Sequence, residues 1–309
     1  MPAKIATNPV DHVVPLNINH LEGRMLKLPA PKRRNREILL LYGSHSNLER
    51  MFSLAEELNK YGAVTMPDLP GFGGMDSLYK IGKKPTIESQ ADYLASFVKM
   101  QYRRRRFTII GLSYGFLVAT RMLQKYPELA ARVDFAVSLV GFAHKDDFRI
   151  APNRKWLIRN GTGLFRLRPL SFMATVLFRG PVITLTYKAL AGRHAKMKDA
   201  DPEELRKRIA FEKILWTTND FRTYFYHTHE MFMVDLCTAQ TKVPVYHVAV
   251  GNDQYFDNKL VEQHLAIIYS SVTMLSVSMK AHMPTIIATA AEIAPLIPQK
   301  LRKALSARP

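Results

Sequence analysis

Cysteine and acidic residues are both scarce in this sequence of 309 residues. The single cysteine, Cys237, excludes an intramolecular disulfide, which is typical of proteins from a reducing compartment. Aspartate and glutamate number 26 against 44 lysines and arginines, so the formal net charge at pH 7 is +18. Such a charge indicates either a solvated basic surface or attraction to an anionic partner.

Long apolar runs are missing as well. Residues 1–8 lack the apolar stretch of a signal peptide. The longest apolar segments, 169–178 and 181–190, are too short to cross a bilayer and are separated by Arg179. We therefore expect a soluble, cytoplasmic protein. The sequence contains no internal repeat or low-complexity tract, and its 47% of apolar residues are enough for a large core.

The most informative segment is Gly-Leu-Ser-Tyr-Gly at 111–115, which matches the motif G-x-S-x-G. The run 106–110 before it predicts a short buried strand, and the segment 115–126 after it predicts a helix that stops before Pro127. A strand-to-helix turn this tight strains the serine backbone and raises the hydroxyl above the sheet. Ser113 is therefore the candidate nucleophile.

Short apolar runs alternate with helical patterns along most of the chain. This alternation predicts an α/β fold: a mainly parallel, eight-stranded-type sheet with helices on both faces. A hairpin is expected first, with its turn around Glu22-Gly23. A last helix is expected from about Thr285 to Leu305, bent or broken by Pro295 and Pro298. The expected strands are 12–18, 25–28, 38–42, 63–66, 107–110, 133–140, 243–250 and 272–278.

The interval 144–242 does not fit this alternation, because its pattern is mostly helical. We divide the chain into a first part of the core at 1–143, an inserted helical cap or lid at 144–242, and a second part of the core at 243–309. From Arg149 to Lys198 the insertion holds eleven lysines and arginines and no acidic residue. Large apolar residues are interspersed with them. This composition is typical of an ordinary lid packed on a core, or of an element that contacts an amphiphile or a membrane surface.

A serine nucleophile needs a base and an acid that orients the base. His282, in Ala-His-Met-Pro just beyond the last expected strand, is the candidate base. Asp253, after the penultimate strand, is the first candidate for the acid. The order Ser113, Asp253, His282 is the Ser…Asp…His order that accompanies this elbow. The alternatives for the acid are Asp257, then Asp146 and Asp147.

With these motifs the sequence resembles α/β-hydrolase fold proteins with an inserted cap, over nearly its whole length. The segment Asp68-Leu-Pro-Gly-Phe-Gly-Gly-Met-Asp76 is similar to the family's D-x-P-G-x-G-x-S-D loop, and Tyr42-Gly43-Ser44 stands where the family usually has His-Gly-x. The resemblance implies an oxyanion hole made by the backbone N–H groups of Ser44 and Tyr114, and no metal or organic cofactor. The acid motif here is Gly-x-Asp, whereas Gly-x-x-Asp is common in the family.

The expected function is that of a serine hydrolase, carboxylesterase-like or lipase-like, which cleaves an apolar or amphiphilic acyl ester through an acyl-enzyme. Ser113 argues against the aspartate-nucleophile chemistry of haloalkane dehalogenases and epoxide hydrolases. His227-Thr-His229-Glu230 offers no third metal ligand at a suitable spacing, and no nucleic-acid-binding motif occurs. The alternative hypothesis is a basic hydrolase-fold protein, non-catalytic or weakly catalytic, that docks on an anionic membrane surface.

Overall fold

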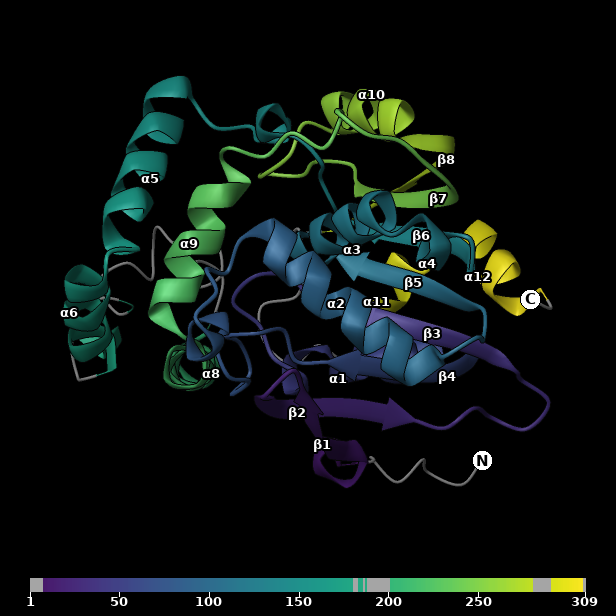
Figure 1. Ribbon diagram of the computed structural model, residues 1–309, viewed down its shortest axis with the longest axis horizontal. Coiled ribbons are helices and arrows are strands. Elements are labelled where there is room, and N and C mark those ends of the chain that lie inside the picture. The colour runs from purple at the N-terminus through teal and green to yellow at the C-terminus, as the bar shows by residue number, and fades with distance from the viewer. Residues whose placement is uncertain (1–7, 180–182, 186, 188–200, 280–289, 308–309) are drawn as a thin grey trace.

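A computed structural model of the protein describes residues 8–179, 183–185, 187, 201–279 and 290–307. Its centre is an eight-stranded sheet with the strand order β1-β2-β4-β3-β5-β6-β7-β8 (Figure 1). The strands are β1 (Val13–Ile18), β2 (Leu21–Leu28), β3 (Arg36–Leu41), β4 (Gly62–Pro67), β5 (Phe107–Leu112), β6 (Val133–Leu139), β7 (Thr241–Val250) and β8 (Tyr269–Val277).

The sheet is mainly parallel, as the sequence predicts. Strands β4, β3, β5, β6, β7 and β8 pair parallel with their neighbours, whereas β1 and β2 form an antiparallel hairpin that joins the sheet at β4. All six residues of β5 are buried. A strand buried on both faces requires a continuous apolar run rather than an alternating one.

The hairpin turns three residues earlier than expected. Its turn consists of Asn19 and His20, which both have positive φ, 53° and 65°, as a two-residue type I′ turn requires. The prediction of a turn at Glu22-Gly23 is therefore wrong. Gly23 instead lies inside β2, where a Cβ atom would come within 2.0 Å of the sulfur of Met75.

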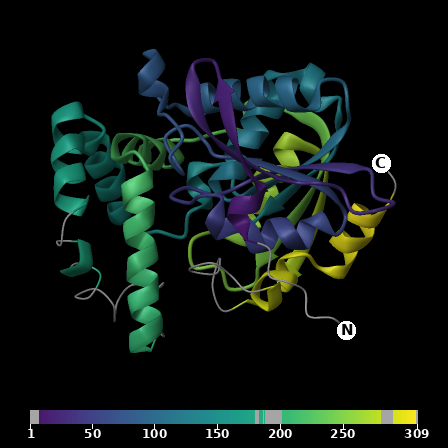
Figure 2. The same cartoon turned by 90° about the horizontal axis from the view of Figure 1, so that it is seen from below.

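Helices cover both faces of the sheet (Figures 1 and 2). Helix α2 (Ile87–Tyr102) packs with α3 (Tyr114–Lys125) on one face, and α1 (Phe52–Asn59) packs with α11 (Ala290–Ile293) on the other. The remaining helices are α4 (Pro127–Ala130), α5 (Pro152–Phe165), α6 (Arg168–Arg179), α8 (Pro202–Thr218), α9 (Phe221–Met231), α10 (Asn258–Ile268) and α12 (Gln299–Ser306). In the described part of the chain, no helix combines the length and the apolar character needed to traverse a membrane.

The C-terminal helix is interrupted at the two prolines, as expected. Pro295 lies in a 3-10 turn, Ala294–Leu296, that follows α11, and Pro298 is the N-cap residue of α12. The ring of proline fixes φ and lacks an N–H donor, so a helix can begin at proline but not continue through it. The first part of this expected helix, 285–289, lies outside the described residues.

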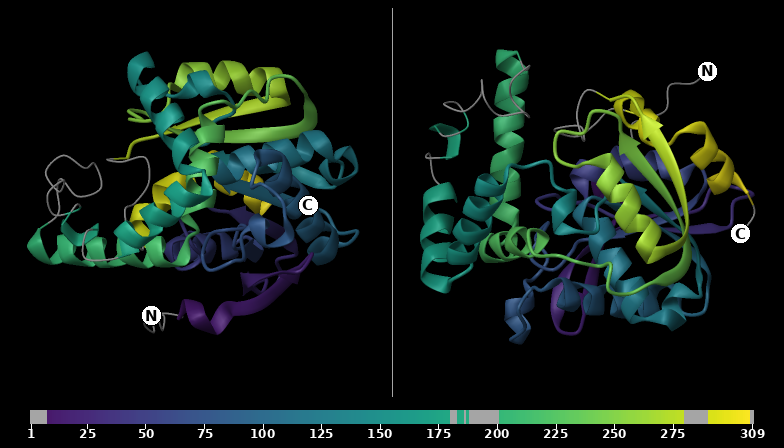
Figure 3. Two further views of the ribbon diagram at one scale, coloured as in Figure 1. Left: turned by 60° about the vertical axis from the view of Figure 1, so that its left-hand side comes forward. Right: turned by 90° about the horizontal axis from the view of Figure 1, so that it is seen from above.

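Of the helices whose bounds the structure describes, α5, α6, α8 and α9 come between β6 and β7 in the chain. They stand together at one end of the molecule, away from the sheet (Figures 1 and 3). Helices α5 and α6 both pack against α9. The division at 144 and 242 stays a prediction, and β7 already begins at Thr241. We refer to these four helices as the cap.

Among the described histidines, His247 in β7 and His227 in α9 are fully buried. Nδ1 of His247 lies 2.8 Å from Oγ of Ser138, and Nε2 of His227 lies 3.0 Å from Nε2 of Gln90. Burial lowers the pKa of His247 to about 4 and that of His227 to about 3, because a charged imidazole would lose its hydration. Both rings are therefore neutral at neutral pH.

We expect acid to destabilise the fold through these two rings. In the unfolded chain each binds a proton below about pH 6.5, whereas folded His247 binds one only near pH 4. Their contribution to the free energy of unfolding is therefore complete above pH 6.5 and is lost as the pH falls toward 4. Each ring lowers this free energy by ~1.4 kcal/mol per pH unit in that range. Urea denaturation at several pH values between about 5 and 7 gives the free energy of unfolding as a function of pH. This free energy should rise less steeply with pH in His247→Asn than in wild type, by the amount that one ring contributes.

Comparing wild type with His247→Asn separates the contribution of His247 from that of other groups that titrate in this range. Burial raises the pKa of Asp68 to about 8, so this carboxyl changes stability in the opposite direction over the same range, being protonated in the folded chain and ionised in the unfolded one. Equal slopes in wild type and His247→Asn would contradict a neutral, buried ring at position 247.

Candidate active site

Ser113 occupies the turn between β5 and α3, at the carboxyl edge of the sheet. Its backbone angles are φ 47° and ψ −116°, a conformation that residues other than glycine rarely adopt. The N–H of Ser113 donates to the carbonyl of Leu139 (3.0 Å), and its own carbonyl accepts the N–H of Phe116 (3.0 Å). The turn therefore has the strained geometry that the G-x-S-x-G motif predicts.

The two glycines of the motif are required by close packing. A Cβ atom on Gly111 would lie 2.4 Å from Cα of Phe116, and one on Gly115 would lie 2.5 Å from the carbonyl oxygen of Tyr42. Both distances are far below van der Waals contact. Only glycine lets the first turn of α3 rest directly on the ends of β5 and β3.

The loop after β3 lies against Ser113. A Cβ atom on Gly43 would be 3.4 Å from Cβ of Ser113. In the segment 38–48 all residues except Ser44 are buried, and in the segment 107–120 all residues except Ser113 are buried. Tyr114 begins α3, where N–H groups have no partner within the helix and the helix dipole is positive. The assignment of the oxyanion hole to the amides of Ser44 and Tyr114 stays a prediction.

Asp253 follows β7 at the same edge of the sheet and is 2% exposed. Its Oδ1 accepts the backbone N–H groups of Tyr255 (2.7 Å) and Phe256 (3.3 Å). These donors fix the orientation of the carboxylate and solvate its charge. A buried, fixed carboxylate is what the orienting acid of a triad needs.

Asp257, the second candidate, caps a helix. It is the N-cap residue of α10, and its Oδ1 accepts the N–H groups of Lys259 (3.0 Å) and Leu260 (3.3 Å). This arrangement is the ordinary role of aspartate at a helix N-terminus.

The remaining two candidates lie after β6. Asp147 is fully buried, accepts the N–H of His144 at Oδ2 (2.9 Å), and has Oδ1 2.5 Å from Nδ1 of His264. The side chain of Asp146 is 60% exposed beside His144. Asp147 is thus held in a buried hydrogen-bond network and Asp146 faces solvent, and Asp253 stays the first candidate for the acid.

The candidate base, His282, lies outside the described residues, so its position relative to Ser113 stays a prediction. Strand β8 runs parallel to β7 and ends at Val277. The chain therefore leaves the sheet at the edge where Ser113 and Asp253 lie.

The cap holds the loop that carries Ser44. The next residue, His45, has a positive φ of 53° and is 8% exposed. Its ring lies 4.1 Å from the ring of Trp216, its Nδ1 is 3.3 Å from Nδ2 of Asn219, and its Nε2 is 3.4 Å from Oε2 of Glu212. Glu212 and Trp216 of α8, together with its C-cap residue Asn219, thus surround the imidazole of His45.

Glu212 and Asn219 were not predicted from the sequence. Glu212 is 2% exposed, and Tyr187 donates its hydroxyl to it (3.0 Å). Its charge favours the charged form of Arg50, whose pKa burial lowers. The side-chain oxygen of Asn219 accepts the N–H of Gly73 (2.8 Å). The sequence does contain an indication of the role of Glu212, because this glutamate interrupts the apolar face of α8. A carboxylate that is buried on such a face requires a partner.

Tyr42, which stands where the family usually has histidine, supports the neighbouring loop. Its hydroxyl donates to Oδ1 of Asp68 (2.8 Å) and accepts the N–H of Leu69 (2.8 Å). Arg24 donates to Oδ2 of the same carboxyl group (3.1 Å). The substitution therefore ties the ends of β3 and β4 together rather than altering the chemistry of the site.

His227 and His229, considered as a metal pair, each have another partner. The ring of His227 stacks on that of Tyr114 at 4.6 Å, and Nδ1 of His229 lies 2.9 Å from the carbonyl oxygen of Arg159. In the part of the chain that the structure describes, no group of three potential ligands is arranged to hold a metal ion.

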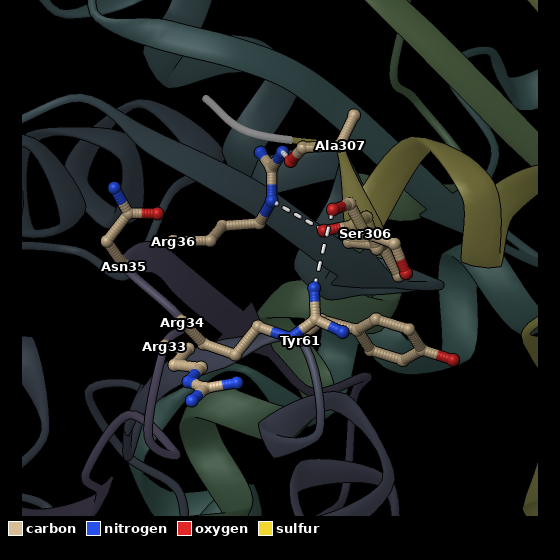
Figure 4. A pocket seen from close by; sticks show the side chains of 8 residues that line it. Arg33, Arg34, Asn35, Arg36, Tyr61, Ser306 and Ala307 are labelled. Carbon is tan, nitrogen blue, oxygen red and sulfur yellow. Dashed lines mark hydrogen bonds between the residues drawn. The ribbon is translucent and has the colours of Figure 1, made fainter.

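A pocket of about 590 Å³ lies elsewhere and does not belong to the site (Figure 4). Its guanidinium groups bind carbonyls at the end of α12: Arg36 donates to Leu305 (2.9 Å) and Arg34 to Ser306 (3.4 Å). Such contacts satisfy the free carbonyls of a helix C-terminus. Because Arg36 begins β3, the pocket lies at the edge of the sheet opposite Ser113.

Comparison with protein-family models finds no match, and neither does comparison with curated proteins. Solved structures do match. They include an N-formylmaleamic acid deformylase from Pseudomonas putida S16, with 16% identity and a TM-score of 0.65, covering 92% of this chain and 99% of that one. A thermophilic esterase from Thermogutta terrifontis has 16% identity and a TM-score of 0.57, with 92% and 91% covered. The epoxide hydrolase CorEH has 14% identity and a TM-score of 0.65, with 95% and 97% covered.

These matches establish the fold. The chain has the α/β-hydrolase fold that its motifs resemble. The names of the matching proteins indicate different reactions, and a fold at this identity does not specify the bond that is cleaved.

We expect Gly115→Ala to destabilise the protein by about 1–3 kcal/mol, because the new methyl group would be forced against backbone carbonyls that cannot move independently. Gly161→Ala is the matched control. Gly161 lies inside α5, and no atom lies within 4 Å of the position that a Cβ atom would take there, so alanine should be neutral or stabilise by up to about 1 kcal/mol. Urea denaturation of both variants tests this; equal effects would contradict the close packing at Gly115.

Proposed function

We propose that the protein is a serine hydrolase that cleaves carboxylic esters of apolar or amphiphilic acyl compounds. The observation that carries the proposal is the backbone of Ser113, strained at φ 47° and partly exposed within an otherwise buried segment. Strain of this kind costs about 1–3 kcal/mol and persists where the surrounding structure imposes it. A serine hydroxyl lifted out of a tight turn at a sheet edge is accessible to a carbonyl carbon.

The proposed reaction is acyl transfer through Ser113. Oγ of Ser113 attacks the ester carbonyl while His282 takes its proton, and Asp253 orients the imidazole. The tetrahedral oxyanion is bound by the amides of Ser44 and Tyr114, which contribute about 10²–10³ each in rate. The alcohol leaves with the proton from His282, and a water activated by the same imidazole then hydrolyses the acyl-enzyme.

The aromatic residues of the cap are consistent with an apolar substrate. The side chains that surround His45, next to Ser44, include the aromatic rings of Trp216 and Tyr224, at 4.1 Å and 5.2 Å. Trp216 also stacks on Phe221 at 4.7 Å. Aromatic groups beside the loop that carries Ser44 favour an acyl chain over a charged substituent.

The serine nucleophile is tested by Ser113→Ala. We expect hydrolysis of a p-nitrophenyl ester to fall by at least about 10³-fold, with no change in the unfolding midpoint. A fluorophosphonate probe should label wild type and leave the variant unlabelled. Equal turnover in the two proteins would refute the mechanism. A folded wild type that neither labels nor turns over esters would favour the non-catalytic alternative.

The acid is tested by comparing Asp253→Asn with Asp257→Asn. We expect kcat to fall by about 10³–10⁴-fold in Asp253→Asn, because the asparagine can stabilise the wrong tautomer of the base and carries no charge. Asp257→Asn should retain activity within about threefold, because asparagine caps a helix as well as aspartate does. A large loss in Asp257→Asn with little loss in Asp253→Asn would reverse the assignment.

A further inference from the structure

Helix α6 has the reverse of the usual distribution of side chains in a surface helix. Its inward side chains are small: Ser171 is 4% exposed and Ala174 is 1% exposed. Its outward side chains are large and apolar, with Phe172 70% and Val176 60% exposed. A helix that only covered a core would present the opposite pattern.

Helix α5 also turns large apolar side chains outward. Trp156, Leu157 and Leu164 are 60%, 64% and 52% exposed, whereas Ile158 and Phe165 are half-buried. Their spacing places the three exposed residues on one side of the helix and the other two on the opposite side. We call the exposed large apolar side chains of the two helices the outer face: Trp156, Leu157, Leu164, Phe172, Met173, Val176 and Leu177.

The outer face points away from the rest of the molecule. Both helices pack against α9 with their inner sides, and the ring of Phe165 on α5 stacks on that of Phe225 on α9 at 5.1 Å. In two perpendicular views, α5 and α6 form the end of the molecule farthest from the sheet (Figures 1 and 2). Clustered apolar groups in such a place mark an interaction surface.

The charges on these two helices are all positive. Arg154 lies one turn before Leu157, and Arg168 lies one turn before Phe172; both arginines are exposed. Lys155 and Arg159 on α5 and Arg166, the C-cap residue of α5, are half-buried. Among the described residues, no ion pair involves a side chain of α5 or α6. Cations that flank large apolar groups are typical of helices that lie in the interface of a bilayer.

A groove of about 540 Å³ borders the outer face and is also lined by cations. Arg168 and Phe172 from α6 line it together with Arg222, whose guanidinium lies 3.8 Å from the ring centre of Tyr79 and is thereby fixed. Asp220, the acidic residue of the groove, caps α9 by accepting the N–H of Thr223 (2.7 Å). The groove offers two guanidinium groups beside an exposed phenyl ring, as an anionic head group with its acyl chains would require.

We propose that the outer face docks the protein on bilayers that contain anionic lipid. The apolar side chains insert at the level of the head groups, and Arg154 and Arg168 bind lipid phosphates. A second copy of this chain fits less well, because two outer faces in contact would bring arginines of like charge together in a dehydrated interface. This proposal does not depend on the chemistry of Ser113.

The test is co-sedimentation of the full-length protein with vesicles of phosphatidylcholine, alone or with about 30% phosphatidylglycerol. Ser113→Ala serves as the background, so that lipid hydrolysis cannot change the vesicles. We expect binding only with the anionic lipid, and at least tenfold weaker at about 500 mM than at about 50 mM NaCl. The emission of Trp156 should shift to shorter wavelength on binding, and Trp156→Phe should lose the shift while Trp216 remains.

Two pairs of variants with matched controls locate the surface. Arg154→Gln/Arg168→Gln should weaken binding about fivefold per cation, the equivalent of ~1 kcal/mol each, whereas Arg104→Gln/Lys84→Gln, with the same loss of net charge, should not. Phe172→Ser/Val176→Ser should weaken binding more than about tenfold, whereas Met100→Ser/Ile267→Ser should not. All eight positions are exposed, and unchanged thermal melting confirms folding.

Three outcomes would overturn the proposal. The first is equal binding to neutral and anionic vesicles, or equal effects of the variants and their controls. The second is a dimer in sedimentation velocity that Phe172→Ser/Val176→Ser converts to monomer. The third is loss of binding to duplex DNA, with vesicle binding intact, in Arg154→Gln/Arg168→Gln.

Discussion

The close approach of α3 to the ends of β3 and β5 is the constraint on which the rest of the structure depends. Two glycines make it possible, because a methyl group at 111 or 115 would overlap backbone atoms of Phe116 or Tyr42. The approach leaves Ser113 in a strained conformation and places the loop of Gly43 against it. The position of the candidate nucleophile Ser113, the adjacent loop of Gly43 and the N-terminus of α3 thus all depend on the same close contact, and none of them can shift independently of the others.

The cap contributes to this region through buried polar contacts rather than through apolar packing alone. Asn219 contacts the imidazole of His45 and the N–H of Gly73 at the same time. Glu212 brings a carboxylate into the same buried space as Arg50. Removing one member of such a network leaves an uncompensated charge or dipole in low dielectric, which costs far more than an exposed contact. The cap is therefore coupled to the geometry of the loop that bears Ser44.

The net charge of +18 has more than one structural origin. Arg36 and Arg34 bind carbonyls at the end of α12, and Arg105 and Arg106 pair with Glu37 and Asp134 at the start of the central strands. These arginines lie far from the candidate site and stabilise local structure. The cations of α5 and α6 differ from them, because they lack acidic partners in the described residues and flank exposed apolar groups. Counting charges along the sequence does not separate these cases, whereas exposure and pairing do.

The sequence by itself determined the α/β sheet, the position of every strand to within a few residues, and Ser113 as the residue at the elbow. These features follow from local periodicity and from turn chemistry, which neighbouring residues in the chain specify. It misplaced the hairpin turn, because the positive φ values fall on Asn19 and His20 rather than on the glycine nearby. Only the tertiary structure distinguished the buried, amide-bound Asp253 from the helix cap Asp257, and only it joined Glu212 to His45. The physical reason is that both distinctions depend on contacts between segments distant in the chain, whose burial and pairing no local pattern encodes.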